Sequence, residues 1–231
     1  EFIMAEELNN KWHEIFEELG IKDPEIIADV KFISLKVGQK LSDFGSLPPG
    51  VLFISKGKIR EITKNKMQEP FTTKIYREGA FAGCEHLLRG EDNVCFLSSS
   101  NVEGYLLKAE TFLELITNSK RLLKIFSTIS VQEIFYSLRR NAEFEELEFK
   151  DVQKFLKGKN EYKTKSFYLY NKPKRTTPLK GKYILSSGNV EGVKIGDILT
   201  NPSNINVKGK LPARLIKLTF DLNNKDLIGS S

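Results

Sequence analysis

The sequence predicts an α+β protein, mostly β, with a small antiparallel barrel flanked by helices and followed by a smaller β unit. Between Lys36 and Leu107 short apolar runs alternate with single glycines. These glycines are Gly38, Gly45, Gly50, Gly57, Gly79, Gly83, Gly90 and Gly104. Glycine readily adopts positive φ, so this rhythm is typical of tightly turned barrel strands. Outside the stretch, apolar residues recur at helical spacing, which predicts the flanking helices.

The N-terminal region predicts two helices and then a strand. Apolar residues recur at helical spacing over Glu6–Leu19, and Gly20 is placed to end that helix. Asp23 and Pro24 form an N-cap followed by proline at the first helical position, which predicts a short second helix to about residue 30. From Lys31 the apolar period changes to two, which predicts a strand ending at Gly38.

The barrel itself is predicted from five further apolar runs. We expect strands at Val51–Ser55, Ile59–Thr63, Phe71–Tyr76, Cys95–Ser99 and Gly104–Leu107. The stretch Gly79–Gly90 differs from them, because it has helical spacing and no alternation. It predicts a short helical insert within the barrel, which is where a ligand, if there is one, would lie.

The second half of the chain predicts helices and then strands. We expect helices at Lys108–Ile116, Ser119–Phe126, from Ser130 onward and at Phe149–Leu156, and strands at Ser166–Tyr170, Lys182–Leu185, Val190–Leu199 and Ala213–Phe220. Ser130 and Glu133 fit a capping box, in which the serine accepts from a backbone N–H and the glutamate reaches back. The expected domains are 4–148 for the barrel with its helices and 149–222 for a truncated barrel-like unit, with 223–231 as a frayed tail.

Three matches in the same order indicate an internal repeat. The stretch Gly50–Gly57 shares glycine, serine and glycine at identical spacing with Gly181–Gly188. The tripeptide that begins at Gly79 then parallels the one that begins at Gly196, and Val102–Lys108 parallels Ala213–Thr219. The sequence therefore leaves open a degenerate second copy of the barrel, shorter than the first and without its helical insert.

Composition narrows the function classes. The hydrophobic fraction of 40% is enough for a packed core, and no apolar run reaches the length needed to cross a bilayer. The net charge of +6 is spread among interspersed acids and bases, which favours an ordinary solvated surface over a nucleic-acid footprint; the one basic cluster is Lys172–Lys182. Cys84 and Cys95 form no CxxC pair, so we expect a reducing, cytoplasmic setting and no zinc site.

The order of elements resembles the cyclic-nucleotide-binding domain family over roughly residues 31–116. The glycines at 38, 57, 79 and 83 fall where that family has them, and Leu52–Ile59 and Val102–Leu115 are the most specific matches. The resemblance implies a jelly-roll-like β-barrel with helices before and after it. It also implies that the helical insert is a phosphate-binding cassette, in which exposed N–H groups cradle a phosphate.

The resemblance carries the family's binding positions onto five residues of this chain. Gly83 stands at the cassette glycine. Cys84 stands at the position of the glutamate that accepts from the ribose hydroxyl, with Glu85 one residue later. Asn93 stands where the family has its phosphate-binding arginine. Arg89 lies nearby on the insert, and we expect it to point outward.

These departures favour a cassette kept as a packing element, with no cofactor. A phosphate without its arginine loses a charge-assisted hydrogen bond of about 1.5–3 kcal/mol, and Glu91 and Asp92 add like charge beside it. The alternative is a genuine cyclic-nucleotide sensor in which Glu85 and Arg89 replace the missing pair. His86, also on the insert, is expected to face the surface or to cap the helix.

The barrel followed by a degenerate second unit also resembles the N-terminal regulatory extension of cyanobacterial peptide- and toxin-exporting ABC transporters. The resemblance implies the cytoplasmic side of the inner membrane, and as partners the rest of a transporter, its peptide substrate or a small anionic ligand. No Walker A motif, catalytic cysteine–histidine set or helix-turn-helix is recognisable. We therefore expect a soluble, non-catalytic regulatory fragment and no nucleic acid; a nucleic-acid-binding regulator that uses Lys172–Lys182 is the less favoured alternative.

Overall fold

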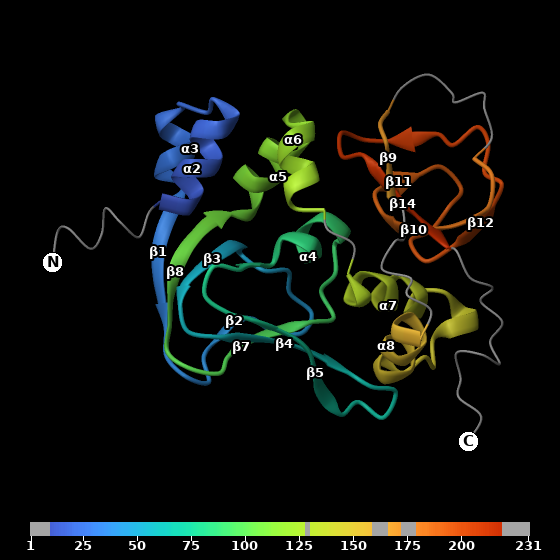
Figure 1. Cartoon of the computed structure of the whole chain (residues 1–231), viewed down its shortest axis with the longest axis horizontal. Helices are drawn as coiled ribbons and strands as arrows, with labels where there is room; N and C mark the ends of the chain where they lie inside the picture. Colours follow the sequence, from blue (N-terminus) through green and yellow to red (C-terminus); the bar gives the residue numbers. More distant parts are fainter. Residues whose placement is uncertain (1–9, 128–129, 159–165, 172–178, 219–231) are drawn as a thin grey trace, which may run out of the picture. The chain divides into compact units, whose positions relative to one another are not determined.

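The computed structural model describes residues 10–127, 130–158, 166–171 and 179–218, and the chain divides into two compact units between Ser127 and Thr128 (Figure 1). We call them the barrel unit and the second unit. In the barrel unit the helices are α2 (Asn10–Leu19), α3 (Pro24–Ala28), α4 (Cys84–Arg89), α5 (Ala109–Asn118) and α6 (Lys120–Ile125). The strands are β1 (Val30–Leu35), β2 (Lys40–Ser42), β3 (Gly50–Lys56), β4 (Ile59–Lys64), β5 (Pro70–Tyr76), β6 (Phe81–Ala82), β7 (Cys95–Ser98) and β8 (Val102–Lys108).

The barrel unit is a jelly roll. Its strands form two four-stranded sheets in the orders β1-β8-β3-β6 and β2-β7-β4-β5, and all pairs are antiparallel. This interleaving of the two sheets along the chain is the double Greek-key connectivity of a jelly roll. The predicted fold class, a jelly-roll-like barrel with flanking helices, is therefore confirmed.

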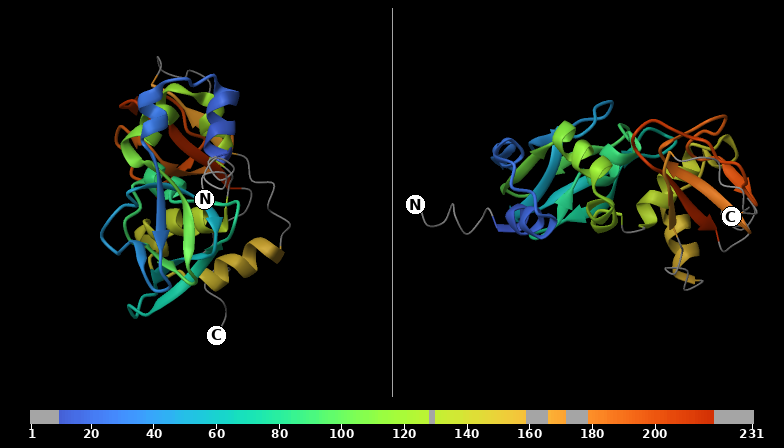
Figure 2. Two further views of the ribbon diagram at one scale, coloured as in Figure 1. Left: turned by 90° about the vertical axis from the view of Figure 1, so that its left-hand side faces the viewer. Right: turned by 90° about the horizontal axis from the view of Figure 1, so that it is seen from above.

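An aromatic cluster attaches the helices to the outer face of the first sheet. Trp12 of α2 is only 1% exposed, and its indole Nε1 donates to the carbonyl oxygen of Tyr105 on β8 at 3.1 Å. Its ring packs against Phe81 of β6 with the ring centroids 5.0 Å apart. Phe126, which follows α6, contacts the same two rings. The helices thus cover one face of β3 and β8 (Figure 2), and the other face is left for the barrel interior.

The second unit contains two helices, a short 3-10 turn and two small sheets. Its elements are α7 (Val131–Arg139), η1 (Ala142–Phe144), α8 (Phe149–Gly158), β9 (Ser166–Leu169), β10 (Lys182–Ser187), β11 (Asn189–Val190), β12 (Ile198–Thr200), β13 (Val207–Lys208) and β14 (Ala213–Leu218). The predicted single strand Val190–Leu199 is wrong: β11 and β12 are separate, because Gly192 and Gly196 adopt positive φ between them. The proposed tail at 223–231 lies outside the described residues.

The sheet of the second unit repeats the first sheet of the barrel unit. Its order, β12-β10-β14-β9, matches β6-β3-β8-β1 strand for strand. The register agrees as well. In the barrel unit Ile54 N donates to Ala80 O at 3.0 Å, and in the second unit Leu185 N donates to Asp197 O at 3.1 Å. The internal repeat indicated by the sequence is thus present in the hydrogen-bond pattern.

The two copies also share an irregularity of the central strand. The pairing of β3 with β8 shifts between Ile54 and Lys56, and that of β10 with β14 shifts between Leu185 and Ser187. A glycine in the left-handed region follows each shift, Gly57 at φ +91° and Gly188 at φ +93°. The second copy keeps the bulge and the turn but lacks a long hairpin, because an isolated bridge joins Val190 directly to Val193.

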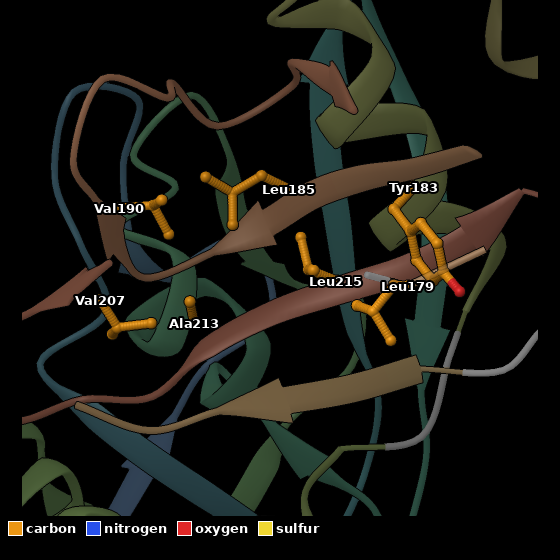
Figure 3. Packing of buried hydrophobic residues seen from close by; sticks show 7 residues of the cluster. All are labelled: Leu179, Tyr183, Leu185, Val190, Val207, Ala213 and Leu215. Atoms are coloured by element: carbon orange, nitrogen blue, oxygen red, sulfur yellow. The ribbon is translucent and has the colours of Figure 1, made fainter. Parts of the chain in front are cut away.

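The buried face of this second sheet forms its own core. The buried members of that core are Leu179, Tyr183, Leu185, Val190, Val207, Ala213 and Leu215 (Figure 3). They come from β10, β11, β13, β14 and the segment before β10, and their side chains converge on one side of the sheet.

Helix α7 packs on the opposite face through a buried ion pair. The Glu133 carboxylate accepts from Arg214 Nη2 at 3.0 Å and from Ser186 Oγ at 2.6 Å, and Arg214 Nε lies 2.7 Å from the carboxylate. The Ser130 half of the predicted capping box is present, since its Oγ accepts from Glu133 N at 3.1 Å. We expected this helix to belong with the barrel in residues 4–148; its ion pair instead joins it to the second sheet.

The shared glycine turn generates a stability prediction. A Cβ at Gly57 would lie 2.1 Å from Asn101 O, and one at Gly188 would lie 2.5 Å from Ala213 Cα. Gly38 also has positive φ, +82°, but a Cβ there meets nothing within 4 Å. Gly38→Ala should therefore cost only the left-handed conformation, about 1–2 kcal/mol. Gly57→Ala and Gly188→Ala should each cost a further ~1–3 kcal/mol of overpacking, measured by urea denaturation. Equal losses in all three variants would contradict this packing.

The ion pair of α7 generates a second stability prediction. Arg214→Leu leaves Glu133 as a buried carboxylate without its cation, which should lower the free energy of unfolding by about 3–5 kcal/mol. The double variant Glu133→Leu with Arg214→Leu removes both charges and should recover a large part of this loss. A double-mutant cycle in chemical denaturation gives the coupling; additive losses would show that the pair is not coupled.

Candidate functional site

The helical insert α4 is held against the barrel by Gly83. This residue is the N-cap of α4 with φ +96°, and it makes no side-chain capping bond. A Cβ at this position would lie 2.9 Å from Gly50 O and 3.2 Å from Pro48 Cβ, so only glycine lets α4 lie this close to the start of β3. At the other end Gly90, at φ +62°, turns the chain out of the helix toward β7.

The sequence-predicted site residues do not converge on one open surface. Cys84 is buried and Glu85 is half-buried. Asn93 is exposed after the helix, where its backbone N–H donates to Glu91 Oε1 at 3.3 Å. The expectation that Arg89 points outward is wrong, because this side chain is buried, at 6% exposure. The arginine position of the resemblance, Asn93, is thus exposed, whereas the arginine that the insert does contain is buried.

His86 is buried as well, so the expectation of a surface-facing or capping histidine is also wrong. Its exposure is 2%, and its ring meets Phe96 of β7 edge to face, with the centroids 4.9 Å apart. His86 and Arg89 are three residues apart and therefore share one face of α4. That face turns into the barrel, because Gly83 fixes how the helix begins.

Beneath this inward face lies a buried carboxylate that the sequence analysis missed. Glu61 of β4 is 0% exposed and accepts from Thr73 Oγ1 and from Tyr76 Oη, both at 2.7 Å. Its Oε2 lies 3.7 Å from His86 Nε2. The available signal was the period of two in β4, where Ile59, Glu61 and Thr63 share the inward side and only the first is apolar.

The interior favours the neutral forms of its donors. Burial lowers the pKa of His86, although the Glu61 carboxylate opposes that shift. Burial, and then the charge of Glu61, raise the pKa of Tyr76 well above its usual value, so its hydroxyl remains a donor. Burial also raises the pKa of the Cys84 thiol to about 12. A buried protonated thiol is a poor nucleophile and a poor metal ligand.

Glu61, Tyr76 and His86 form a buried structural network that is closed to solvent, not an accessible reactive site. Glu61, Tyr76 and His86 are each at most 4% exposed, so a substrate does not reach them without displacing protein. In the described ranges of the chain, no three His, Cys, Asp or Glu side chains are grouped so that they could hold a metal ion. No helix of the described part is long and apolar enough to cross a membrane.

Comparison with known proteins gives matches only among solved structures. No family model and no curated protein matches the chain. The sensor domain of the transcriptional regulator DNR from Pseudomonas aeruginosa matches with a TM-score of 0.44 at 10% identity, over 60% of this chain and 92% of that one. The regulatory domain of Toxoplasma gondii PKA with cAMP matches with a TM-score of 0.39 at 15% identity, over 83% and 78%. The cAMP-bound protein PfPKA-R matches with a TM-score of 0.37 at 12% identity, over 84% and 71%.

The buried histidine generates a pH prediction. The pKa of His86 is lowered in the folded chain, whereas in the unfolded chain it lies near 6.5. The unfolded state therefore takes up a proton first on acidification, and stability falls as pH drops below about 6.5 toward the folded pKa. His86→Leu should flatten this part of the curve of unfolding free energy against pH. Denaturation midpoints from pH 7.5 down to pH 5, about the range over which histidine titrates, measure it. An unchanged slope in the variant would show that His86 is not the group responsible.

Proposed function

We propose that the chain is a non-catalytic regulatory domain of the cyclic-nucleotide-binding type that responds to a macromolecular partner rather than to a cyclic nucleotide. The observation that carries this proposal is the Glu61 carboxylate beneath α4, with its oxygens bonded to Thr73 and Tyr76. The space under the cassette helix is filled by the protein's own side chains, and the charge that faces the helix is negative. The barrel in this proposal serves as a scaffold.

Charge argues against a phosphate at the insert. A bound phosphate would meet Glu61 and Glu91, which are 0% and 4% exposed, in a region where charges are weakly screened. The Asn93 side chain provides no positive charge where the resemblance expects one. Loss of that charge-assisted bond removes about 1.5–3 kcal/mol from binding, before any repulsion is added.

One observation favours the alternative, a genuine cyclic-nucleotide sensor. The Arg89 side chain is buried instead of pointing outward, and Glu85 lies half-buried on the same short helix. A ligand that opened the α4 region would find a cation and a carboxylate there. We rank this function second because Glu61 and Glu91 are buried near the insert and would oppose an anionic phosphate there.

The proposed setting is the cytoplasmic N-terminal part of a peptide- or toxin-exporting ABC transporter. Its support is the sequence resemblance together with the order of the two units, a jelly roll followed by a trimmed repeat of one of its sheets. The partner would be the rest of the transporter or its peptide substrate. Sequencing the native reading frame tests the setting, and a frame that continues into neither a membrane region nor an ATPase would refute it.

A nucleotide titration tests the main proposal. Isothermal titration of the folded chain with cAMP, cGMP and a cyclic dinucleotide should give no saturable heat at concentrations up to about 1 mM, which corresponds to binding weaker than about 4 kcal/mol. Micromolar binding that Glu85→Gln weakens about tenfold would support the sensor instead. Glu85 is half-buried, so this conservative variant should keep the fold, which its circular dichroism spectrum checks.

A further inference from the structure

Among the described residues of the second unit, the strand β12 has one edge that no other strand pairs with. It stands at the end of the sheet order β12-β10-β14-β9. Asp197 O accepts from Leu185 N at 3.1 Å, and Asn201 N donates to Gly181 O at 2.8 Å, so odd-numbered residues here face β10. Because antiparallel ladders alternate, Ile198 and Thr200 direct their N–H and C=O groups away from the sheet. Within the described part of the second unit, β12 pairs with β10 alone.

A pocket of about 330 Å³ lies along this edge. All three residues of β12 line it, Ile198, Leu199 and Thr200. Successive side chains of a strand point to opposite faces of the sheet, so a pocket that touches all three is at the strand's edge rather than on one face. A peptide strand added to β12 would therefore run past its opening.

The pocket combines an apolar floor with a polar rim. Four apolar residues of its lining belong to the core of the second unit or pack against it: Val190, Val193, Leu199 and Ile205. Ser203 and Asn204 are exposed at the rim and offer hydroxyl and amide groups. An apolar side chain suits the floor, and a peptide backbone suits the rim.

The trimmed repeat explains why this edge is accessible. In the common register of the two units Leu199 corresponds to Ala82, because each pairs with the equivalent residue of the central strand. The next residues along the chain, Thr200 and Gly83, then correspond to each other. In the barrel unit α4 follows at once. In the second unit the chain instead turns through Asn201 and Asn204, both at positive φ, and forms no helix.

The charge around the pocket is positive overall, although the one charged residue of the lining, Glu191, is a carboxylate. From residue 179 to residue 218 the chain has six lysines and one arginine against two carboxylates. The arginine bonds Glu133, and one of the two carboxylates, Glu191, lies 3.3 Å from Lys208 Nζ. Lys182 is the register partner of Thr200, and Lys194 follows the pocket residue Val193; both lysines are exposed.

We propose that β12 binds an extended acidic peptide, which adds to the sheet as a further strand and inserts an apolar side chain into the pocket. Main-chain hydrogen bonds to Ile198 and Thr200 supply the pairing, the pocket selects the alternate apolar residue, and the surrounding lysines select acidic neighbours. The inference rests on the proposed function, because it names the partner class of a regulatory domain. It concerns the second unit only, so it can fail while the absence of nucleotide binding at α4 stands.

Thr200 offers a variant that removes the edge donor without touching the ladder to β10. Its N–H points away from β10, and the residue is exposed. Proline is tolerated at such edge positions, so Thr200→Pro removes one donor and places a ring where the peptide would pair. Thr200→Val keeps the N–H and the shape and is the matched control. Equal thermal midpoints of the two variants confirm that both are folded.

The probe is an acetylated, fluorescein-labelled peptide of about eight residues that alternates glutamate and valine, a typical strand length. We expect saturable fluorescence anisotropy with the wild-type chain and with Thr200→Val, and at least about tenfold weaker binding to Thr200→Pro, as expected when a main-chain bond is lost and the edge is blocked. The same peptide N-methylated on alternate backbone nitrogens keeps its side chains and should not bind.

Charge reversal tests the acidic class. A peptide that alternates lysine and valine should bind the wild type at least about tenfold more weakly, and Lys182→Glu should narrow or reverse this preference. Binding that Thr200→Pro leaves unchanged, no binding of the glutamate peptide, or equal binding of the two peptides would each overturn the proposal. So would a concentration-dependent dimer of the wild type that Thr200→Pro abolishes, because the edge would then pair with a second copy of this chain.

Discussion

The close antiparallel pairing of one central strand pair is the constraint on which both units depend. In the barrel unit a Cβ at Gly50 would lie 2.1 Å from Leu107 O, and one at Gly104 would lie 2.3 Å from Phe53 O. The second unit keeps the pair and its bulge, but Leu215 stands at the position of Gly104 and is fully buried. In the second unit Leu215 therefore adds an apolar side chain to the core. This addition offsets the apolar side chains that are lost with the long hairpin. The same pairing of two central strands thus supports the full jelly roll of the barrel unit and the smaller sheet of the second unit.

The two units differ in what fills the inner face of that shared sheet. In the barrel unit the space beneath α4 contains Glu61 with two hydroxyl donors, and His86 lies against it in a form that burial keeps neutral. In the second unit the corresponding face is an apolar cluster without an insert helix above it. A carboxylate that is buried and fully engaged costs desolvation, which its hydrogen bonds repay only while the geometry is intact. The interior of the barrel unit therefore tolerates little rearrangement, because moving either hydroxyl leaves the Glu61 carboxylate short of a hydrogen bond.

The sequence predicted the strands and turns well, because the positions of glycines and the spacing of apolar residues depend directly on backbone geometry. The turn at Gly57, the insert at Gly79–Gly90 and the repeat that ends at Gly188 followed from spacing alone. The inward turn of His86 and Arg89 did not, because a six-residue helix with polar residues on both sides has no dominant apolar face. The burial of Glu61 and the ion pair of Glu133 were missed for a related reason. A buried charge is recognised by its partners, and Tyr76, Ser186 and Arg214 lie 15, 53 and 81 residues away. Strands as short as β11 and β13 give too few residues for a period to appear.

The charge at the β12 edge also determines which kind of strand can pair with it. An unpaired strand edge is a liability for association, and short edge strands flanked by lysine are a common protection against it. β12 has both features: it is three residues long, and Lys182 and Lys194 are exposed beside it. A second copy of the chain would bring the same lysines to the same place, so like charges would oppose edge-to-edge pairing of identical units. An acidic strand brings the opposite charge to these lysines, and Lys208 already offsets Glu191 of the pocket lining at 3.3 Å. The same residues that protect the edge from self-association thus favour an acidic partner, so selection at this edge depends on charge, while the pocket sets the register.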